Sequence, residues 1–219
     1  MTMKFGGGNM ENIKIFVEGI ADDKFIRDYI KSTFEITLEK KHIHNCGGWK
    51  NIFEEDSVNE FIQCKFNGIK PLVIFDADTP EKENGGVKSR KKEIIEKLSA
   101  LDIHIGESQI FLFPNDNSNG DLETLLEQII TKENTPIFDC WNGFEKCIER
   151  KSVEVGKGLT IPAKKAKIHT YCTVLLPDSN SGREKAKEQH RDYTNKSHWD
   201  IGNIALNPLK DFLHEYSSK

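Results

Sequence analysis

The sequence has no long apolar run and no apolar leader, and both absences narrow what the protein can be. No stretch approaches the ~20 apolar residues of a membrane-spanning helix. The first ten residues, MTMKFGGGNM, lack the apolar core of a signal peptide. We therefore expect a soluble, cytoplasmic protein that makes no contact with a membrane.

Paired cysteines and a strong excess of one charge are missing as well. The five cysteines are an odd number, are widely spaced and include no C-x-x-C pair. This pattern argues against a disulfide framework and against a structural zinc site. The net charge of −4 provides no general basic surface for nucleic acid, although a local basic strip could still bind it.

Short apolar runs alternate with amphipathic stretches over residues 11–135. This alternation predicts an α/β fold with a mostly parallel sheet flanked by helices. Crossovers in such a sheet are right-handed, so the carboxyl ends of the strands meet at one edge. The expected strands are NIKIFV at 12–17, HIHNC at 42–46, PLVIF at 71–75 and QIFLF at 109–113.

The rest of the chain divides into a tail and an extension. Residues 1–10 are expected to form a flexible N-terminal tail, and residues 136–219 a helical extension packed on the core. Within this extension, NPLKDFLHEY at 207–216 places apolar side chains on one helical stripe and should dock on the body. The polar stretch 177–196 is expected to be a mobile loop or a weak helix.

An acidic cluster follows the first expected strand. Glu18 ends the strand, Gly19 permits a sharp turn, and Asp22 opens the next helix. Glu18 and Asp22 could therefore face one ion. The alternative for Asp22 and Asp23 is helix capping, in which a carboxylate accepts backbone N–H bonds at the positive end of the helix.

A second acidic cluster, Asp76-Ala77-Asp78, follows the third expected strand. A spacing of two residues puts both carboxylates on the same side of an extended chain. An Asx turn explains one aspartate better than two. Several carboxylates meeting from two strand ends would repel one another unless a cation lay between them, and a hard ion such as Mg²⁺ or Mn²⁺ prefers oxygen ligands.

With Glu18-Gly19 and Asp76-x-Asp78 separated by two β/α units, the chain resembles the Toprim domain of topoisomerases, primases, small RNA-maturation nucleases and OLD-family nucleases. The resemblance covers about residues 12–135. It is greatest to standalone Toprim-like bacterial proteins of unknown function and to the OLD branch. It implies that the metal-binding acids are Glu18, Asp22, Asp76 and Asp78. Glu81 departs from the pattern, because many Toprim proteins have glycine at that position.

The OLD branch also suggests a further acid and a late lysine. For the acid we choose Glu123 over Asp116, and a polar loop with Asp121 capping a helix is the alternative. For the lysine, the sequence IPAKKAKIHTY offers Lys165 or Lys167, and a solvated helix face is the alternative. The basic run SRKKEIIEK at 89–97 is expected to form a solvated helix face, and guidance of a phosphodiester backbone is the alternative.

The resemblance implies hydrolysis of phosphodiester bonds in nucleic acid, DNA more than RNA, with Glu18, Asp76, Asp78 and Lys165 as the catalytic residues. The chain is too short to carry the further domains of a topoisomerase or a primase. Two alternatives stay open. One is a small RNA-maturation nuclease. The other is a non-catalytic Toprim-like module that binds metal, nucleotide or a partner protein, for instance in phage defence. A homodimer is also left open.

Overall fold

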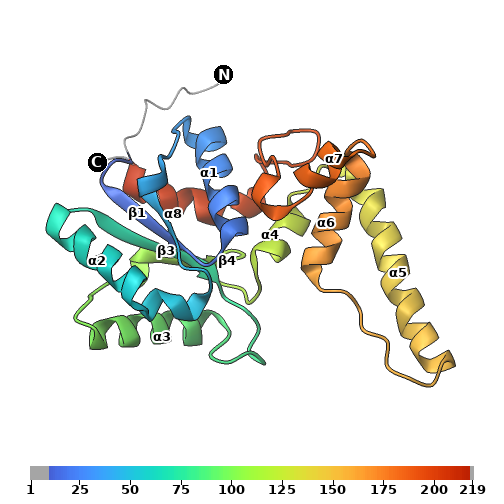
Figure 1. Ribbon diagram of the computed structural model, residues 1–219, viewed down its shortest axis with the longest axis horizontal. Helices are drawn as coiled ribbons and strands as arrows, with labels where there is room; N and C mark the ends of the chain where they lie inside the picture. The colour runs from blue at the N-terminus through green and yellow to red at the C-terminus, as the bar shows by residue number, and fades with distance from the viewer. Residues whose placement is uncertain (1–9, 218–219) are drawn as a thin grey trace.

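The structure is a computed structural model that describes residues 10–217. At its centre lies a four-stranded, all-parallel sheet with strand order β2-β1-β3-β4 (Figure 1). The expected α/β class, with a parallel sheet flanked by helices and a helical C-terminal extension, is confirmed. The strands are β1 (Ile13–Val17), β2 (Ile43–Asn45), β3 (Lys70–Asp76) and β4 (Ile110–Phe113).

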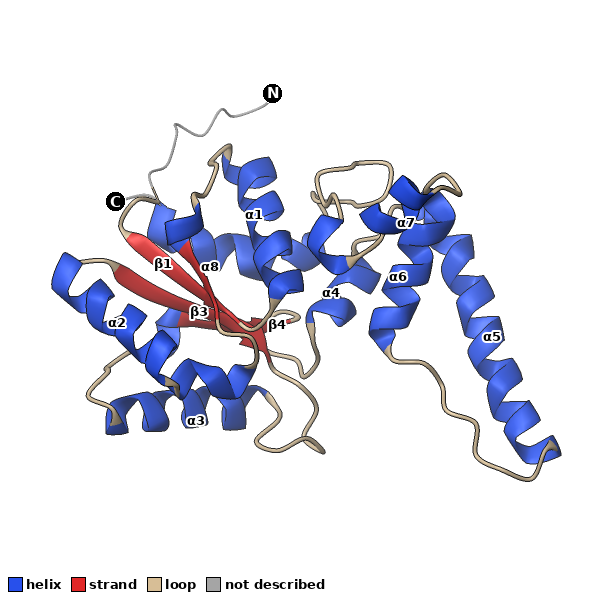
Figure 2. Ribbon diagram, in the orientation of Figure 1, coloured by secondary structure: helices blue, strands red, loops and turns tan. Residues whose placement is uncertain are grey.

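Helices cover both faces of the sheet (Figure 2). The crossover helix α1 packs on one face, whereas α2 and α3 pack on the other. The chain leaves β1 toward β2 on one side, and β3 lies on the other side of β1. The carboxyl ends of β1 and β3 therefore form the switch point at which α/β sheets bind ligands. The helices of this part are α1 (Ile20–Phe34), α2 (Glu55–Asn67), α3 (Val87–Ala100) and α4 (Leu122–Gln128).

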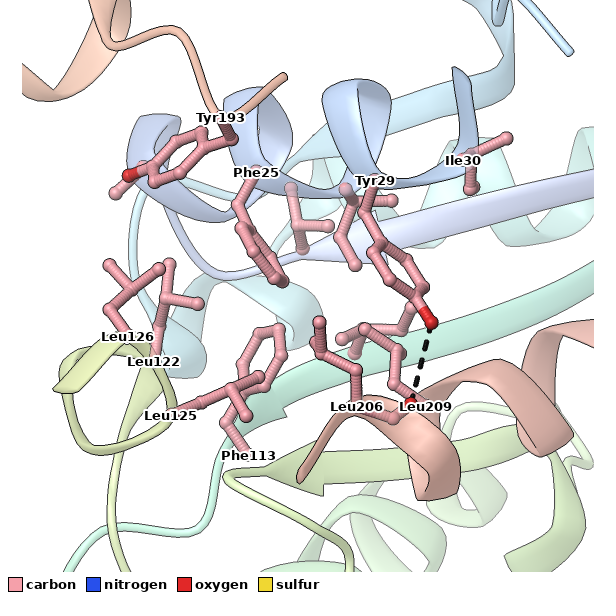
Figure 3. Close-up of a cluster of buried hydrophobic side chains, with 14 of the residues drawn as sticks. Phe25, Tyr29, Ile30, Phe113, Leu122, Leu125, Leu126, Tyr193, Leu206 and Leu209 are labelled. Atoms are coloured by element: carbon pink, nitrogen blue, oxygen red, sulfur yellow. Dashed lines mark hydrogen bonds between the residues drawn. The ribbon is translucent and has the colours of Figure 1, made fainter. Parts of the chain in front are cut away.

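Side chains alternate between the two faces, as the pleat of a strand requires. Along β1, Ile15 and Val17 join the core beneath α1, whereas Phe16 stacks on Phe61 of α2 on the opposite face. Figure 3 shows the first of these cores, where the rings of Phe25 of α1 and Phe113 of β4 pack edge to face beside leucines of α4. Both faces of the sheet are thus buried, which explains why the strands read as nearly continuous apolar runs.

The C-terminal segment adds to the first core. Helix α8 is amphipathic as expected and buries Leu209 and Leu213, and α6 buries Ile168 and Tyr171 in the same cluster. Helix α5 differs, because Phe138 is its one buried side chain. This helix and the loop after it extend away from the sheet (Figure 1). The segment comprises α5 (Thr135–Glu154), α6 (Lys164–Leu175), α7 (Asn180–Lys185) and α8 (Asn207–Ser217).

The sequence predicts a flexible tail at residues 1–10 and a mobile loop or a weak helix at residues 177–196. Residues 1–9 of the expected tail lie outside the described residues, while Met10 is buried in the core. Residues 177–196 form α7 and a 3-10 helix, η5 (Glu188–His190). Buried Ala186, Arg191 and Tyr193 anchor this stretch, so a polar composition does not prevent it from packing.

All five cysteines are free thiols, in line with the absence of paired motifs. No helix in residues 10–217 combines the length and the apolar character that crossing a membrane requires.

Candidate functional site

Carboxylates gather at the switch point of the sheet. Glu18 follows β1 and Asp76 ends β3, and the register pairs Val17 with Ile74 on these neighbouring strands. Two more acids come from the first turns of α1 and α4. Together the four acids line a pocket of about 400 Å³, which we call the carboxylate pocket: Glu18, Asp22, Asp76 and Glu123.

The turn after β1 orients the first two acids. Gly19 is the N-cap of α1, and its N–H donates to Asp22 Oδ2 over 2.8 Å. Asp22 therefore accepts a backbone N–H at the start of the helix, as the capping interpretation predicts, and it also lines the pocket. Asp23 instead pairs with Arg27 at 2.5 Å. Glu18 Oε2 is buried and has no hydrogen-bond partner within the described residues.

The other two acids are placed by the start of α4. Asp121 caps this helix, as the alternative interpretation of this segment predicts, by accepting the Thr124 N–H at 2.9 Å. The N–H of Leu122, the first residue of the helix, donates to Asp76 Oδ1 over 2.8 Å. This bond ties the end of β3 to the start of α4 and brings the buried Glu123 to the same pocket.

Two glycines form the remaining wall on the β2 side. Gly47 and Gly48 have φ values of 72° and 135°, which strongly favour glycine. The N–H of Gly48 donates to the carbonyl oxygen of Glu18 over 2.8 Å. Because no side chain projects here, a ligand could approach the backbone closely.

Burial and mutual repulsion raise the pKa values of the pocket acids. Burial is the largest cause for each acid. The pKa of Asp22 rises to about 7, helped by the charge of Glu18. Burial, followed by the charges of Asp22, Glu18 and Glu123, raises the pKa of Asp76 well above its usual value. The structure thus gathers carboxyl groups at a site where burial and mutual repulsion oppose their full ionisation.

One lysine enters the pocket. Burial lowers the pKa of Lys165, but the charges of the surrounding acids, Glu123 first, outweigh burial and raise it overall. Lys165 Nζ lies 3.8 Å from Glu188 Oε1. The neighbouring lysines point elsewhere: Lys164 pairs with Asp121, and Lys167 pairs with Glu127 at 2.9 Å. The structure therefore singles out Lys165, which the sequence leaves unranked against Lys167.

Asp78 lies outside the carboxylate pocket, which differs from the expected pair of adjacent ligands. Its φ of 58° shows that the chain leaves the extended conformation on which the expected shared side depends. Asp78 Oδ2 accepts from Arg90 Nη2 at 2.9 Å, and Oδ1 accepts from Lys82. Arg90, expected on a solvated helix face, is instead fully buried and stacks on Trp49 at 3.9 Å.

Two other acids complete the comparison with the sequence. Asp116, the acid not chosen in favour of Glu123, pairs with Lys91 at 2.7 Å and does not line the pocket. Glu188 does line it, and sequence reasoning missed this residue. It lies in the polar stretch 177–196, where no apolar run or spacing marks it, so the sequence contained no signal for it.

The side chains of the pocket could bind a hard divalent cation, because its acids provide oxygen ligands. Glu18 Oε2 in particular has no hydrogen-bond partner within residues 10–217. The side chains are not already arranged to coordinate such a cation. In residues 10–217, no three His, Cys, Asp or Glu side chains stand in an arrangement that could hold a metal ion. Binding would therefore require the carboxylates to rotate toward one another.

Comparisons with known proteins place the chain in a family without assigning an activity. No curated protein and no solved structure matches it. The model of one family, described as a protein of unknown function (DUF3226), matches residues 12–216. Because this match spans nearly the whole sequence, the chain belongs to the DUF3226 family.

Proposed function

We propose that this protein is a Mg²⁺- or Mn²⁺-dependent hydrolase of phosphodiester bonds in nucleic acid, of the Toprim type that its sequence resembles. One observation carries the proposal: four acids, two of them buried and two half-buried, meet at the switch point of a parallel sheet, with one lysine beside them. If these acids had only a structural role, each would be expected to pair with a cationic side chain. The pocket instead contains four acids and a single lysine.

The side chains divide the work. Glu18, Asp22, Asp76 and Glu123 would hold the cation. A divalent cation would supply Lewis-acid stabilisation of the charge that develops during phosphodiester hydrolysis. Lys165 would bind a phosphate oxygen and orient the scissile group. Gly47 and Gly48 leave room for the substrate backbone beside Glu18.

A cleavage assay with purified full-length protein tests the proposal. Single- and double-stranded DNA and a structured RNA would be incubated with millimolar Mn²⁺ or with EDTA. We expect Mn²⁺-dependent cleavage that falls by ~10²-fold or more in Asp76→Asn and Glu18→Gln. Asp116→Asn is the matched control, because this acid lies outside the pocket and should leave activity intact. Cleavage that persists in EDTA or in Asp76→Asn would refute the proposal.

One observation favours a second candidate, a non-catalytic module that binds metal or nucleotide. The pairing of Asp78 with Arg90 and Lys82 leaves Asp76 as the one pocket acid of the D-x-D motif. Calorimetric titration with Mn²⁺ separates the candidates. Binding that depends on Asp76 without cleavage of any substrate supports the module, while cleavage of RNA but not DNA indicates a small RNA nuclease.

A further inference from the structure

A second cavity of about 220 Å³ has a chemistry opposite to that of the carboxylate pocket. It lies between α6, the end of α7 and the residues that follow η5. We call it the basic cavity, because side chains that donate hydrogen bonds or carry positive charge contribute to its wall. Four of these side chains are Lys185, Arg191, Asn195 and His198.

Arg191 is the central feature of the basic cavity. Only 2% of this residue is exposed. Its Nε–H donates to the carbonyl oxygen of Ala186 at 3.0 Å, whereas Nη1 is buried without a hydrogen-bond partner. No ion pair within residues 10–217 involves Arg191, and the charge of Glu188 acts on it only from beyond ion-pair distance. Cys172 and Tyr193 beside it are neutral at physiological pH, because burial raises the pKa of both, that of Cys172 to about 11.

A buried guanidinium that forms no ion pair carries a large desolvation cost. Neither Asp192 nor Glu188 forms an ion pair with Arg191 within residues 10–217. Asp192 also lines the cavity, but its Oδ1 accepts from the N–H and the hydroxyl of Thr194 in its own turn. Glu188 faces the carboxylate pocket and Lys165. An oxyanion bound in the cavity would supply the missing charge and acceptor atoms.

We propose that the basic cavity binds a phosphate group, with Arg191 as its buried anchor and Lys185 as an exposed second cation. Phosphate could come from free inorganic phosphate or from the end of a nucleic-acid strand. The second source fits the geometry because η5 separates the two pockets: Glu188 lines the carboxylate pocket, and His190 lines the basic cavity. The proposal does not depend on catalysis.

Titration calorimetry in EDTA tests this site separately from any metal-dependent activity. Full-length protein would be titrated with inorganic phosphate, with a 5′-phosphorylated oligonucleotide and with its 5′-hydroxyl counterpart, all at matched ionic strength. We expect saturable binding of phosphate. Preference for the phosphorylated oligonucleotide assigns the source to a strand end, and equal binding of the two oligonucleotides assigns it to free phosphate.

Variants locate the binding. Loss of one charge-assisted contact should weaken phosphate binding about 10-fold in Lys185→Ala and more in Arg191→Met. Lys187→Ala is the matched control, because this nearby lysine pairs with Glu184 and does not line the cavity. Lys185→Ala keeps the test valid if Arg191→Met fails to fold. Absence of saturable phosphate binding, or binding that Lys185→Ala leaves unchanged, would overturn the proposal.

Discussion

Asp22 has two roles that compete for one carboxylate. It accepts the N–H of Gly19 at the start of α1, which favours the ionised form, and it lies buried beside other acids, which favours the protonated form. Burial outweighs the hydrogen bond and raises its pKa to about 7. Between about pH 4 and pH 7, the folded protein therefore holds a proton on Asp22 that the unfolded chain releases.

This raised pKa predicts how stability depends on pH. Because the folded pKa lies above the usual 3.8, the contribution of Asp22 is full below about pH 4 and is lost as pH rises through about 7. Metal-free protein should thus lose up to about 4 kcal/mol of unfolding free energy from this source between pH 4 and pH 8. Urea unfolding in EDTA measures it. Asp22→Asn, which keeps an oxygen for Gly19, should show a weaker dependence, and an identical pH profile would contradict the pKa shift.

Lys165 is predicted to act on substrate rather than on stability. It is more exposed than the acids and touches Glu188 at 3.8 Å, an ion pair worth little. Lys165→Met should therefore change unfolding free energy by less than about 1 kcal/mol while lowering the cleavage rate by ~10²-fold. Lys164→Met is the control, since its ammonium pairs with Asp121 outside the pocket. Equal loss of activity in both variants would show that general surface charge is responsible.

At the level of elements, the loop from β3 to α3 separates two aspartates that the sequence presents together. Asp76→Asn should remove Mn²⁺ binding without loss of stability, since it relieves repulsion in the carboxylate pocket and keeps an acceptor for Leu122. Asp78→Asn should do the reverse. It breaks a buried pair with Arg90 and should cost about 3 kcal/mol while leaving Mn²⁺ affinity unchanged. Calorimetry measures the Mn²⁺ affinity of both variants, and urea unfolding measures their unfolding free energy. A loss of Mn²⁺ binding in Asp78→Asn would contradict the prediction and show that Asp78 is a ligand.

The same loop shows what sequence reasoning could reach. The strands and the acids at their ends were predictable because apolar runs and parallel topology fix both the elements and their common edge. The pairing of Asp78 with Arg90 was not predictable, because it depends on a positive φ and on a helix turning a charged residue inward. Glu188 was missed for a related reason: a few buried side chains, such as Tyr193, position an otherwise polar segment.

At the level of the whole molecule, the C-terminal segment and the sheet share one core. Leu213 of α8 belongs to the same cluster as Ile15 of β1. Leu213→Ala should therefore lower the unfolding free energy by about 2–5 kcal/mol in a single transition. Val153→Ser near the end of α5 is the contrasting variant, because Val153 is 83% exposed and its loss should have little effect. Two separate transitions in urea would show that the segment folds independently.

The wider architecture also explains why the acids meet where they do. Strand order β2-β1-β3-β4 makes β1 and β3 neighbours, although α1, β2 and α2 lie between them in the sequence. Glu18 and Asp76 thus approach each other only in the folded chain, and segment 164–217 completes the pocket with Lys165 and Glu188. The carboxylate pocket therefore forms only when the sheet and segment 164–217 are both folded.

Diffraction from a Mn²⁺-soaked crystal, measured for anomalous scattering, tests most directly whether these acids hold a divalent cation. We predict an anomalous peak in the carboxylate pocket, coordinated by Glu18 and Asp76 with the side chains rotated inward. A crystal with Mn²⁺ bound elsewhere, or with no peak between these two residues at saturating Mn²⁺, would contradict the metal site and the hydrolase proposed from it.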